Sequence, residues 1–330
     1  MNNLQFIGID ISKDKFDASF LKNAERLKFK DKKFENNPKG ALKLLEWINN
    51  TVGTEPQYIY ITLEPTGVYH EMLAYFLYDK GFLVNVVNPA RIPAFADSKG
   101  IVHKTDKSDS RLLARFGADN SQERWQPEPL EIRQLKAKVS RLDALKEDLQ
   151  REKNRLEQAQ IGHLPDEVVV SICEIIQALE QAIVKLEKDI DDHIDRHPDL
   201  KKDRALLRTI PGVGPVLSTK MMLLYRGHSF KKAADMAAFV GLIPRKRESG
   251  KYVGKIMLSK RGSAKLRAAL YMPAVSAKTH NPDIKALCQR LIAKGKTNMQ
   301  AIGAAMRRLV HICFGVLKHQ SVYQSQTVNV

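Results

Sequence analysis

The chain has 330 residues, 43% of them hydrophobic, so it can bury a sizeable core and is not mainly a disordered basic tail. Its 54 Lys and Arg residues outnumber 37 Asp and Glu residues, and the net charge of +17 predicts a polyanionic partner, as in a nucleic-acid enzyme or a basic ribosomal or chromatin protein. Three scattered cysteines indicate neither a disulfide framework nor a zinc site, and the absence of a signal peptide or an apolar membrane span predicts a cytoplasmic protein without a membrane partner.

Two short apolar runs near the N-terminus predict buried strands, each with a carboxylate toward its carboxyl end. Residues 6–12 include Asp10 and are too few, and too rich in β-branched side chains, for a helix. Residues 58–63 alternate and end at Glu64, where Pro-Thr-Gly stops the strand before an amphipathic helix expected over residues 68–78. Because open α/β sheets place their sites at strand carboxyl ends, Asp10 and Glu64 are candidate site residues.

A predicted helix over residues 104–114 carries two further carboxylates. Asp106 and Asp109 are three residues apart and therefore share a helix face. Four converging carboxylates would repel one another, so the cluster predicts a divalent metal ion, Mg²⁺ or Mn²⁺. Such ions support in-line displacement at the phosphates of nucleic acids. Any one of these residues alone has the alternative of an ordinary surface acid.

The middle of the chain predicts a helical hairpin. A proline-punctuated hinge at residues 125–129 precedes two arms with heptad-spaced apolar residues, separated by Gly-His-Leu-Pro at residues 162–165. The apolar positions are Leu135, Val139, Leu142, Leu149 and Leu156 in the first arm and Ile172, Ile176, Leu179, Ile183, Leu186 and Ile190 in the second. The hairpin can be a rigid spacer or a contact with a second subunit.

A helix-hairpin-helix motif is predicted over residues 206–217. Its Pro-Gly-Val-Gly core contains Gly212 and Gly214, which would let backbone N–H groups approach a DNA phosphate. The alternative is a tight turn between two packed helices.

Ser249 is a candidate nucleophile, because it lies next to a glycine among basic residues that would attract a phosphate and neutralise its developing charge. The alternative is a simple Ser-Gly turn. Ser259 and Ser263 are rivals, although one of them is expected to cap the helix predicted at residues 265–277. The basic residues expected to contact nucleic acid here are Arg245, Lys246, Arg247, Lys251, Lys260, Arg261 and Arg267.

These motifs together resemble the bridge-RNA-guided insertion-sequence transposases, the insertion-sequence one-ten family, from residue 4 to about residue 318. Asp10 in Gly-Ile-Asp-Ile-Ser, Glu64 in Glu-Pro-Thr-Gly-Val-Tyr, and Asp106 and Asp109 in Lys-Thr-Asp-Lys-Ser-Asp look like that family's DEDD domain. Gly-Leu-Ile-Pro at residues 241–244, Ser-Gly and Leu-Ser-Lys-Arg-Gly at residues 258–262 look like its catalytic-serine region.

The resemblance implies a RuvC-like domain that holds Mg²⁺ with the four carboxylates, and a covalent phosphoserine link between Ser249 and DNA. It also implies a structured bridge RNA that pairs with target and donor DNA, and a homo-oligomer, either a dimer or a tetramer.

The fold predicted from all this is an α/β RNase H-like (RuvC-like) N-terminal domain, a helical hairpin or coiled coil, and a mainly α-helical C-terminal domain. The predicted boundaries are 1–125, 126–198 and 199–330. Two other functions remain open at this point. A metal-dependent endonuclease or Holliday-junction resolvase would cut DNA with activated water and leave no protein on the product. A non-catalytic DNA- or RNA-binding protein would not cut at all.

Overall fold

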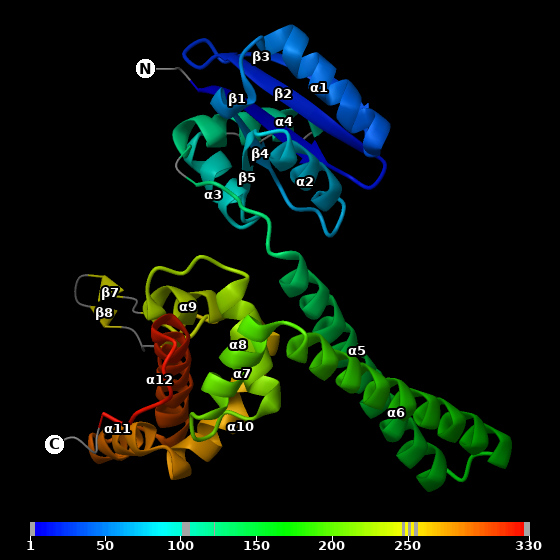
Figure 1. The fold of residues 1–330 in the computed structure, drawn as a ribbon, viewed down its shortest axis with the longest axis vertical. Helices are drawn as coiled ribbons and strands as arrows, with labels where there is room; N and C mark the ends of the chain where they lie inside the picture. The colour runs from blue at the N-terminus through cyan, green and yellow to red at the C-terminus, as the bar shows by residue number, and fades with distance from the viewer. Residues whose placement is uncertain are drawn as a thin grey trace. The chain divides into compact units, whose positions relative to one another are not determined.

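A computed structural model describes residues 4–100, 106–121, 123–245, 248–249, 252–253 and 257–326, without the side chains of residues 106–107, 248–249 and 252–253 (Figure 1). The chain divides into two compact units, Met1–Pro127 and Glu128–Val330. The predicted separation of the hairpin from the C-terminal domain at residues 198/199 stays a prediction.

The N-terminal unit is built on a five-stranded mixed sheet of strand order β3-β2-β1-β4-β5. The first three strands form antiparallel pairs, whereas β4 runs parallel to β1 and β5 parallel to β4. This order is that of the RNase H-like fold, which confirms the predicted fold class. The strands are β1 (Gln5–Ile11), β2 (Lys15–Asn23), β3 (Lys28–Glu35), β4 (Ile59–Leu63) and β5 (Leu83–Val86).

One face of this sheet is apolar. Ile7, Ile9 and Ile11 of β1 share a buried cluster with Leu44 of helix α1 and Leu73 of helix α2. A short 3₁₀ helix precedes β4. The bounds are α1 (Pro38–Val52), η1 (Pro56–Tyr58) and α2 (Glu71–Asp79). Helix α2 begins three residues later than predicted, because turns occupy the chain between Thr66 and Glu71.

The other face of the sheet carries helix α4 (Asp106–Asp119), which packs with α3 (Arg91–Ser98). Helix α4 rests directly on β1 at Gly8. A Cβ at Gly8 would lie 2.0 Å from the carbonyl oxygen of Ser110 and 2.2 Å from the backbone nitrogen of Ala114. Only glycine therefore permits this approach of helix to strand.

The second unit begins with the predicted antiparallel hairpin of α5 (Leu130–Ile161) and α6 (Asp166–Asp195) (Figure 1). Contacts between the two helices show that they are antiparallel, because residue numbers rise along α5 while those of the partners fall along α6. Lys138 Nζ donates to the carbonyl of Asp189 at 3.2 Å, and farther along Lys153 pairs with Glu180 at 2.8 Å.

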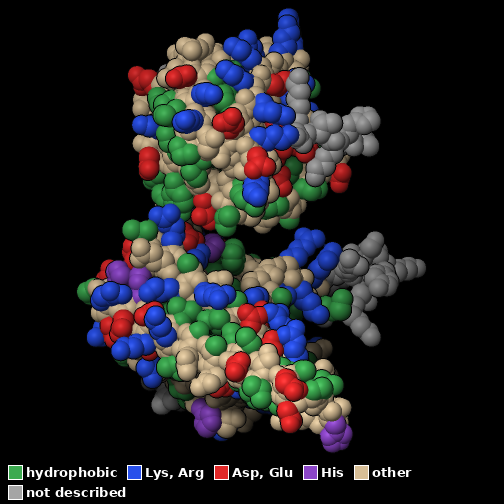
Figure 2. Space-filling view, turned by 90° about the vertical axis from the view of Figure 1, so that its right-hand side faces the viewer, with side chains coloured by type: hydrophobic (Ala, Val, Ile, Leu, Met, Phe, Trp, Pro, Cys, Tyr) green, Lys and Arg blue, Asp and Glu red, His purple; other side chains and the backbone are tan. Residues whose placement is uncertain are grey.

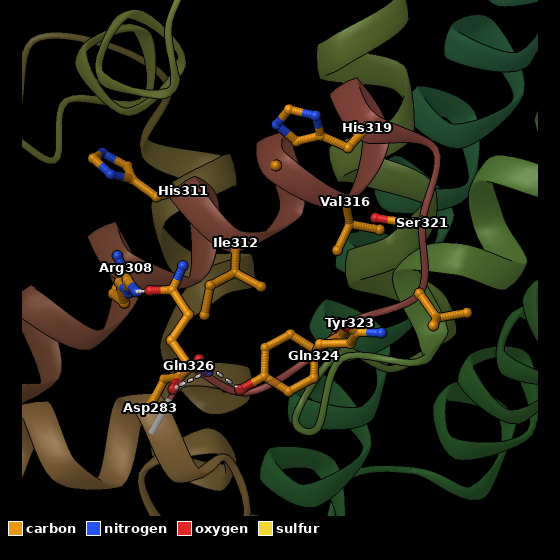
Figure 3. Close-up of a pocket in the computed structure, with 12 residues that line it drawn as sticks. Asp283, Arg308, His311, Ile312, Val316, His319, Ser321, Tyr323, Gln324 and Gln326 are labelled. Atoms are coloured by element: carbon orange, nitrogen blue, oxygen red, sulfur yellow. Dashed lines mark hydrogen bonds between the residues drawn. The ribbon is translucent and has the colours of Figure 1, made fainter. Parts of the chain in front are cut away.

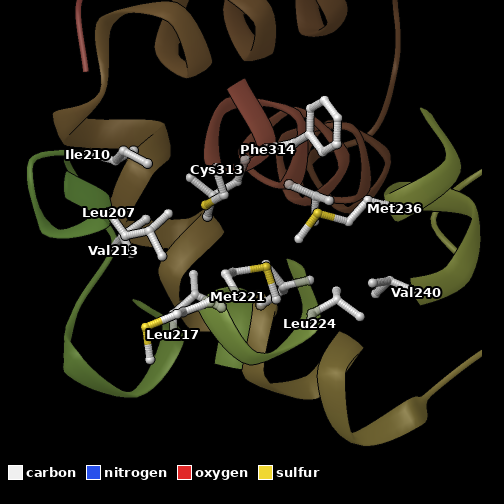
Figure 4. Packing of buried hydrophobic residues seen from close by; sticks show 14 of the residues in the cluster. Leu207, Ile210, Val213, Leu217, Met221, Leu224, Met236, Val240, Cys313 and Phe314 are labelled. Carbon is white, nitrogen blue, oxygen red and sulfur yellow. The ribbon is translucent and has the colours of Figure 1, made fainter. Parts of the chain in front are cut away.

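Further helices complete the mainly α-helical C-terminal region, as predicted. They are α7 (Pro198–Arg208), α8 (Pro215–Arg226), α9 (Ala233–Val240), α10 (Ala264–His280), α11 (Pro282–Ala293) and α12 (Asn298–His319). Leu207, Met221, Met236 and Phe314, from four of these helices, meet in one core (Figure 4). Burial raises the pKa of the Cys313 thiol in this core to about 12, so the thiol stays protonated and packs as an apolar group. Among the described helices, none is both long and apolar enough to cross a lipid bilayer.

Candidate active site

Asp10 and Glu64 lie on neighbouring parallel strands. The register of β1 and β4 pairs Ile9 with Leu63; Asp10 comes next within β1, and Glu64 is the first residue after β4. Both side chains are partly buried. Adjacent strands of the RNase H-like sheet therefore present two of the candidate carboxylates at the same edge.

Asp106 and Asp109 belong to the first turns of α4. Ser110 and Ala114 of this helix contact Gly8, which lies two residues before Asp10 and hence on the same sheet face. Helix α4 thus lies on the face that carries Asp10. Asp109 is partly buried, whereas the side chain of Asp106 lies outside the described atoms.

Carboxylate oxygens are the ligands that Mg²⁺ and Mn²⁺ prefer, so the donor chemistry of these residues fits a divalent ion. Their placement on one sheet face fits it as well. Among the side chains that the structure describes, however, no group of three or more His, Cys, Asp and Glu is arranged to hold a metal ion. A complete shell therefore requires Asp106 or a closer approach of the carboxylates.

Other polar residues of this face were not predicted from the sequence. Asp17 of β2 is the cross-strand partner of Asp10, and its carboxylate lies 3.6 Å from Lys33 Nζ. Ser19 and Asp31 follow on β2 and β3, and Arg111 of α4 pairs with Asp31. The available signal was the alternation of β2, in which Asp17 and Ser19 are interleaved with apolar side chains.

Ser249 lies in the second unit, in a short strand. Strand β7 (Glu248–Ser249) pairs antiparallel with β8 (Tyr252–Val253), and Ser249 is opposite Tyr252. The flanking strands β6 (Pro244–Arg245) and β9 (Met257–Leu258) pair with each other, so both ends of this segment are held by the fold. The Ser249 side chain, Lys246, Arg247 and Lys251 lie outside the described atoms.

The two rival serines have structural roles. The hydroxyl of Ser263 caps α10 by accepting a hydrogen bond from the backbone nitrogen of Leu266 at 3.2 Å, as expected for one of them. The hydroxyl of Ser259 accepts from the backbone nitrogen of Arg261 at 3.3 Å. Both contacts organise the turn that leads into α10.

The basic residues near this turn differ in accessibility. Arg245, Lys260 and Arg261 are exposed, so a phosphate can reach them. Arg267 instead donates from Nη1 to the carbonyls of Val240 and Gly262, at 3.1 and 3.0 Å. Its guanidinium therefore ties α10 to the preceding turn. On the face of each unit that Figure 2 shows, Lys and Arg side chains are distributed over the surface.

The predicted helix-hairpin-helix segment is formed by α7, the turn at residues 209–214, and α8. Its two glycines differ. Gly212 has φ of 95°, and a Cβ there would lie 2.9 Å from the carbonyl oxygen of Pro273, so Gly212 serves the packing of the turn against α10. A Cβ at Gly214 would meet nothing within 4 Å, and this residue precedes the N-terminus of α8. The turn is thus open at Gly214.

A pocket of about 270 Å³ lies elsewhere in the second unit, between α12 and the C-terminal segment (Figure 3). The hydroxyl of Tyr323 donates to Asp283 at 2.9 Å, and Arg308 donates to Gln326 at 2.9 Å. Burial lowers the pKa of His311, so this imidazole is neutral near pH 7. None of the candidate catalytic residues lines this pocket.

Comparison with known proteins gives two family matches. Residues 7–163 match the DEDD transposases of the IS110 type, described as "Transposase", and residues 204–289 match the "Transposase IS116/IS110/IS902 family". The first match contains Asp10, Glu64, Asp106 and Asp109, and the second contains Ser249. A DEDD transposase domain implies a divalent metal ion in general.

Individual relatives agree with these matches. The chain is 33% identical to the "Pilin gene-inverting protein" of Moraxella lacunata, over 97% of this chain and 98% of that protein. It is 25% identical to the "Transposase for insertion sequence element IS1111A" of Coxiella burnetii, over 41% of this chain and 38% of that protein. The chain therefore belongs to the IS110 family of transposases, enzymes whose substrate is DNA.

Proposed function

We propose that the protein is an RNA-guided recombinase of an insertion sequence, which cuts and rejoins DNA through a covalent link to Ser249. The observation that carries this proposal is the placement of Asp10 and Glu64 on neighbouring parallel strands, on the sheet face that also carries the helix of Asp106 and Asp109. Such an arrangement suits chemistry at a phosphate, and the second family match contains a candidate nucleophile.

In the proposed reaction the Ser249 hydroxyl attacks a DNA phosphorus and gives its proton to a base. A bond forms between Oγ and phosphorus, and the phosphorus–oxygen bond to one deoxyribose breaks, so that this oxygen leaves as a hydroxyl after taking up a proton. A divalent ion held by Asp10, Glu64, Asp106 and Asp109 would supply polarisation of the phosphate. A deoxyribose hydroxyl of another strand then displaces Ser249, which restores the serine and joins the strands without net loss of a phosphodiester.

The same chemistry serves insertion and inversion, because the outcome depends on which strand ends are exchanged. Inversion is the activity in the name of the Moraxella lacunata relative. We propose insertion of a mobile element as the outcome here, and inversion as the outcome when both sites lie in one DNA molecule in opposite orientations.

Guidance by a bridge RNA is the second part of the proposal. The net charge of +17 supports a protein that grips nucleic-acid backbones, while base pairing would supply the choice of sequence. We expect purified protein to cut a target duplex only with the RNA encoded beside its gene. Replacing the pairing segment of this RNA should move cleavage to the newly matched target, as read on a sequencing gel.

An RNA whose pairing segment is scrambled is the matched control, since it keeps the scaffold and the charge. Cleavage of the original target at an undiminished rate with the scrambled RNA, or with no RNA, would contradict RNA guidance.

We also propose a homo-oligomer, a dimer or tetramer, that pairs through the hairpin. Helix α6 exposes Val168 and Ile175 at 41 and 49% of their surface, and these two residues are seven apart and so share one face of the helix. Apolar surface of this kind is typical of a protein interface. Light scattering coupled to gel filtration tests it, and a protomer mass at all concentrations, with and without nucleic acid, would argue against it.

A further inference from the structure

A row of small and polar residues crosses the sheet beneath α4. The registers place Gly8 opposite Ser19 and Thr62, with Asp31 beyond Ser19 and Asn85 beyond Thr62. Ser19 and Thr62 are fully buried. Because buried polar groups cost free energy unless they are hydrogen-bonded, a polar row of this kind under a helix calls for a specific role.

The contacts of this row connect three elements. The Ser19 hydroxyl donates to Asp31 Oδ1 at 2.8 Å, and the hydroxyls of Ser19 and Ser110 lie 2.8 Å apart. Because Ser19 has a single proton, which goes to Asp31, Ser110 is the donor to Ser19 in this arrangement. Arg111 Nε donates to the same Asp31 oxygen at 3.0 Å, and Arg111 Nη2 bonds the other oxygen, which makes the pair bidentate.

Additional contacts hold the two ends of this chain of hydrogen bonds. The guanidinium of Arg111 lies 5.2 Å from the ring centre of Phe29 on β3. Ser110 is only 1% exposed, and its carbonyl is the group that a side chain at Gly8 would strike. Side chains of β2 and β3 thus hold the first turns of α4 by hydrogen bonds and an ion pair. The close packing of α4 on Gly8 of β1 sets the distance between the helix and the sheet.

These contacts are made by Ser110 and Arg111, the two residues that immediately follow Asp109. A helix that slips by one residue shifts by about 1.5 Å and turns by about 100°, which would move Asp106 and Asp109 relative to Asp10. Metal and catalytic groups require placement to within roughly 0.5 Å. The hydrogen-bond partners of Ser110 and Arg111 therefore determine where α4 presents its carboxylates.

We propose that Ser19, Asp31, Ser110 and Arg111 form a positioning network that sets the rotation and register of α4 and so completes the carboxylate site. The inference rests on the proposed function, because it assumes that Asp106 and Asp109 act with Asp10 and Glu64. None of the four residues is itself required to touch metal or DNA.

A charge effect and a positioning effect predict opposite changes in cation affinity for Arg111→Gln, and this difference makes the network testable. Arg111→Gln removes a positive charge, so a purely Coulombic effect would strengthen the binding of a cation, whereas Asp31→Asn would weaken it. If the network positions α4, both changes weaken cation binding. Partners in the shell around metal ligands typically change metal affinity by about 10–100-fold.

The experiment measures Mn²⁺ binding to the full-length chain by electron paramagnetic resonance, together with the melting temperature. The variants are Arg111→Gln, Asp31→Asn, their double mutant and Ser110→Ala, which removes only one hydroxyl. Asp119→Asn is the matched control, because Asp119 pairs with Lys99 at 2.8 Å at the other end of the same helix. We expect about tenfold weaker binding in each network variant, a double mutant no weaker than the worse single, and an unchanged control.

Asp10→Asn run in parallel separates the two claims. Weaker binding in Asp10→Asn together with wild-type binding in the folded network variants would overturn the positioning network and leave the carboxylate site intact. Tighter binding in Arg111→Gln would also overturn it, in favour of a charge effect. Wild-type binding in Asp10→Asn would instead overturn the proposed site itself.

Discussion

Asp10→Asn should lower the rate of DNA strand cleavage by on the order of 10²–10³-fold or more, because it removes a negatively charged oxygen from the proposed metal site while keeping the shape of the side chain. DNA and RNA binding should change little, since affinity for a polyanion comes mainly from basic residues. The measurement is the single-turnover cleavage of labelled target DNA in the presence of RNA and Mg²⁺.

Asp14→Asn is the matched control, because Asp14 is exposed in the turn between β1 and β2 and undergoes the same chemical change nearby. It should keep the wild-type rate. Equal rates for Asp10→Asn and Asp14→Asn would remove the carboxylates from the reaction and favour a different site.

Ser249→Ala should abolish the covalent protein–DNA adduct and reduce cleavage by more than about 10³-fold, because loss of a nucleophile removes the first chemical step. The adduct is detected as a labelled band of protein mass on a denaturing gel. Folding should be unaffected, and the melting temperature checks this.

Ser263→Ala and Ser259→Ala are the controls for this change. Loss of the α10 cap in Ser263→Ala should cost about 1 kcal/mol of stability but leave the adduct in place. Cleavage that persists in Ser249→Ala, with products that carry no protein, would sink the serine mechanism and leave a metal-dependent endonuclease or resolvase.

The sequence was sufficient for much of the architecture, because the patterns concerned are local. A β-branched run predicted the strand of Asp10, alternation predicted the strand that ends before Glu64, and heptad spacing predicted the hairpin of α5 and α6; the structure confirms all three. The fold class follows from the same elements and from the resemblance to the family.

The surroundings of the carboxylates could not be predicted from the sequence, because they depend on contacts between residues far apart in the chain. Ser19 meets Ser110 across 91 positions, and Arg111 meets Asp31 across 80. No local pattern specifies such pairs. Nothing in the sequence distinguishes Gly8 from the other glycines, although the packing of α4 against β1 depends on it.

The strand that carries Ser249 could not be predicted either. Strands of two residues are too short to show an alternation of apolar and polar side chains, so β7 and β8 look like a turn in the sequence. The helix-hairpin-helix motif predicts the same role for Gly212 and Gly214. In the structure Gly212 packs against α10, whereas Gly214 is open.

The central claim is that Ser249 carries the DNA during recombination, and the most direct test identifies the attached residue. The reaction with RNA, target and donor DNA and Mg²⁺ would be stopped by denaturation, the DNA trimmed with nuclease, and the protein digested for peptide mass spectrometry. We predict a nucleotide joined through its phosphate to Ser249 on the peptide that contains this residue, and its absence when Asp10→Asn protein is used. A nucleotide on Tyr252, Ser259 or Ser263, or cleaved DNA with no modified peptide, would contradict the account.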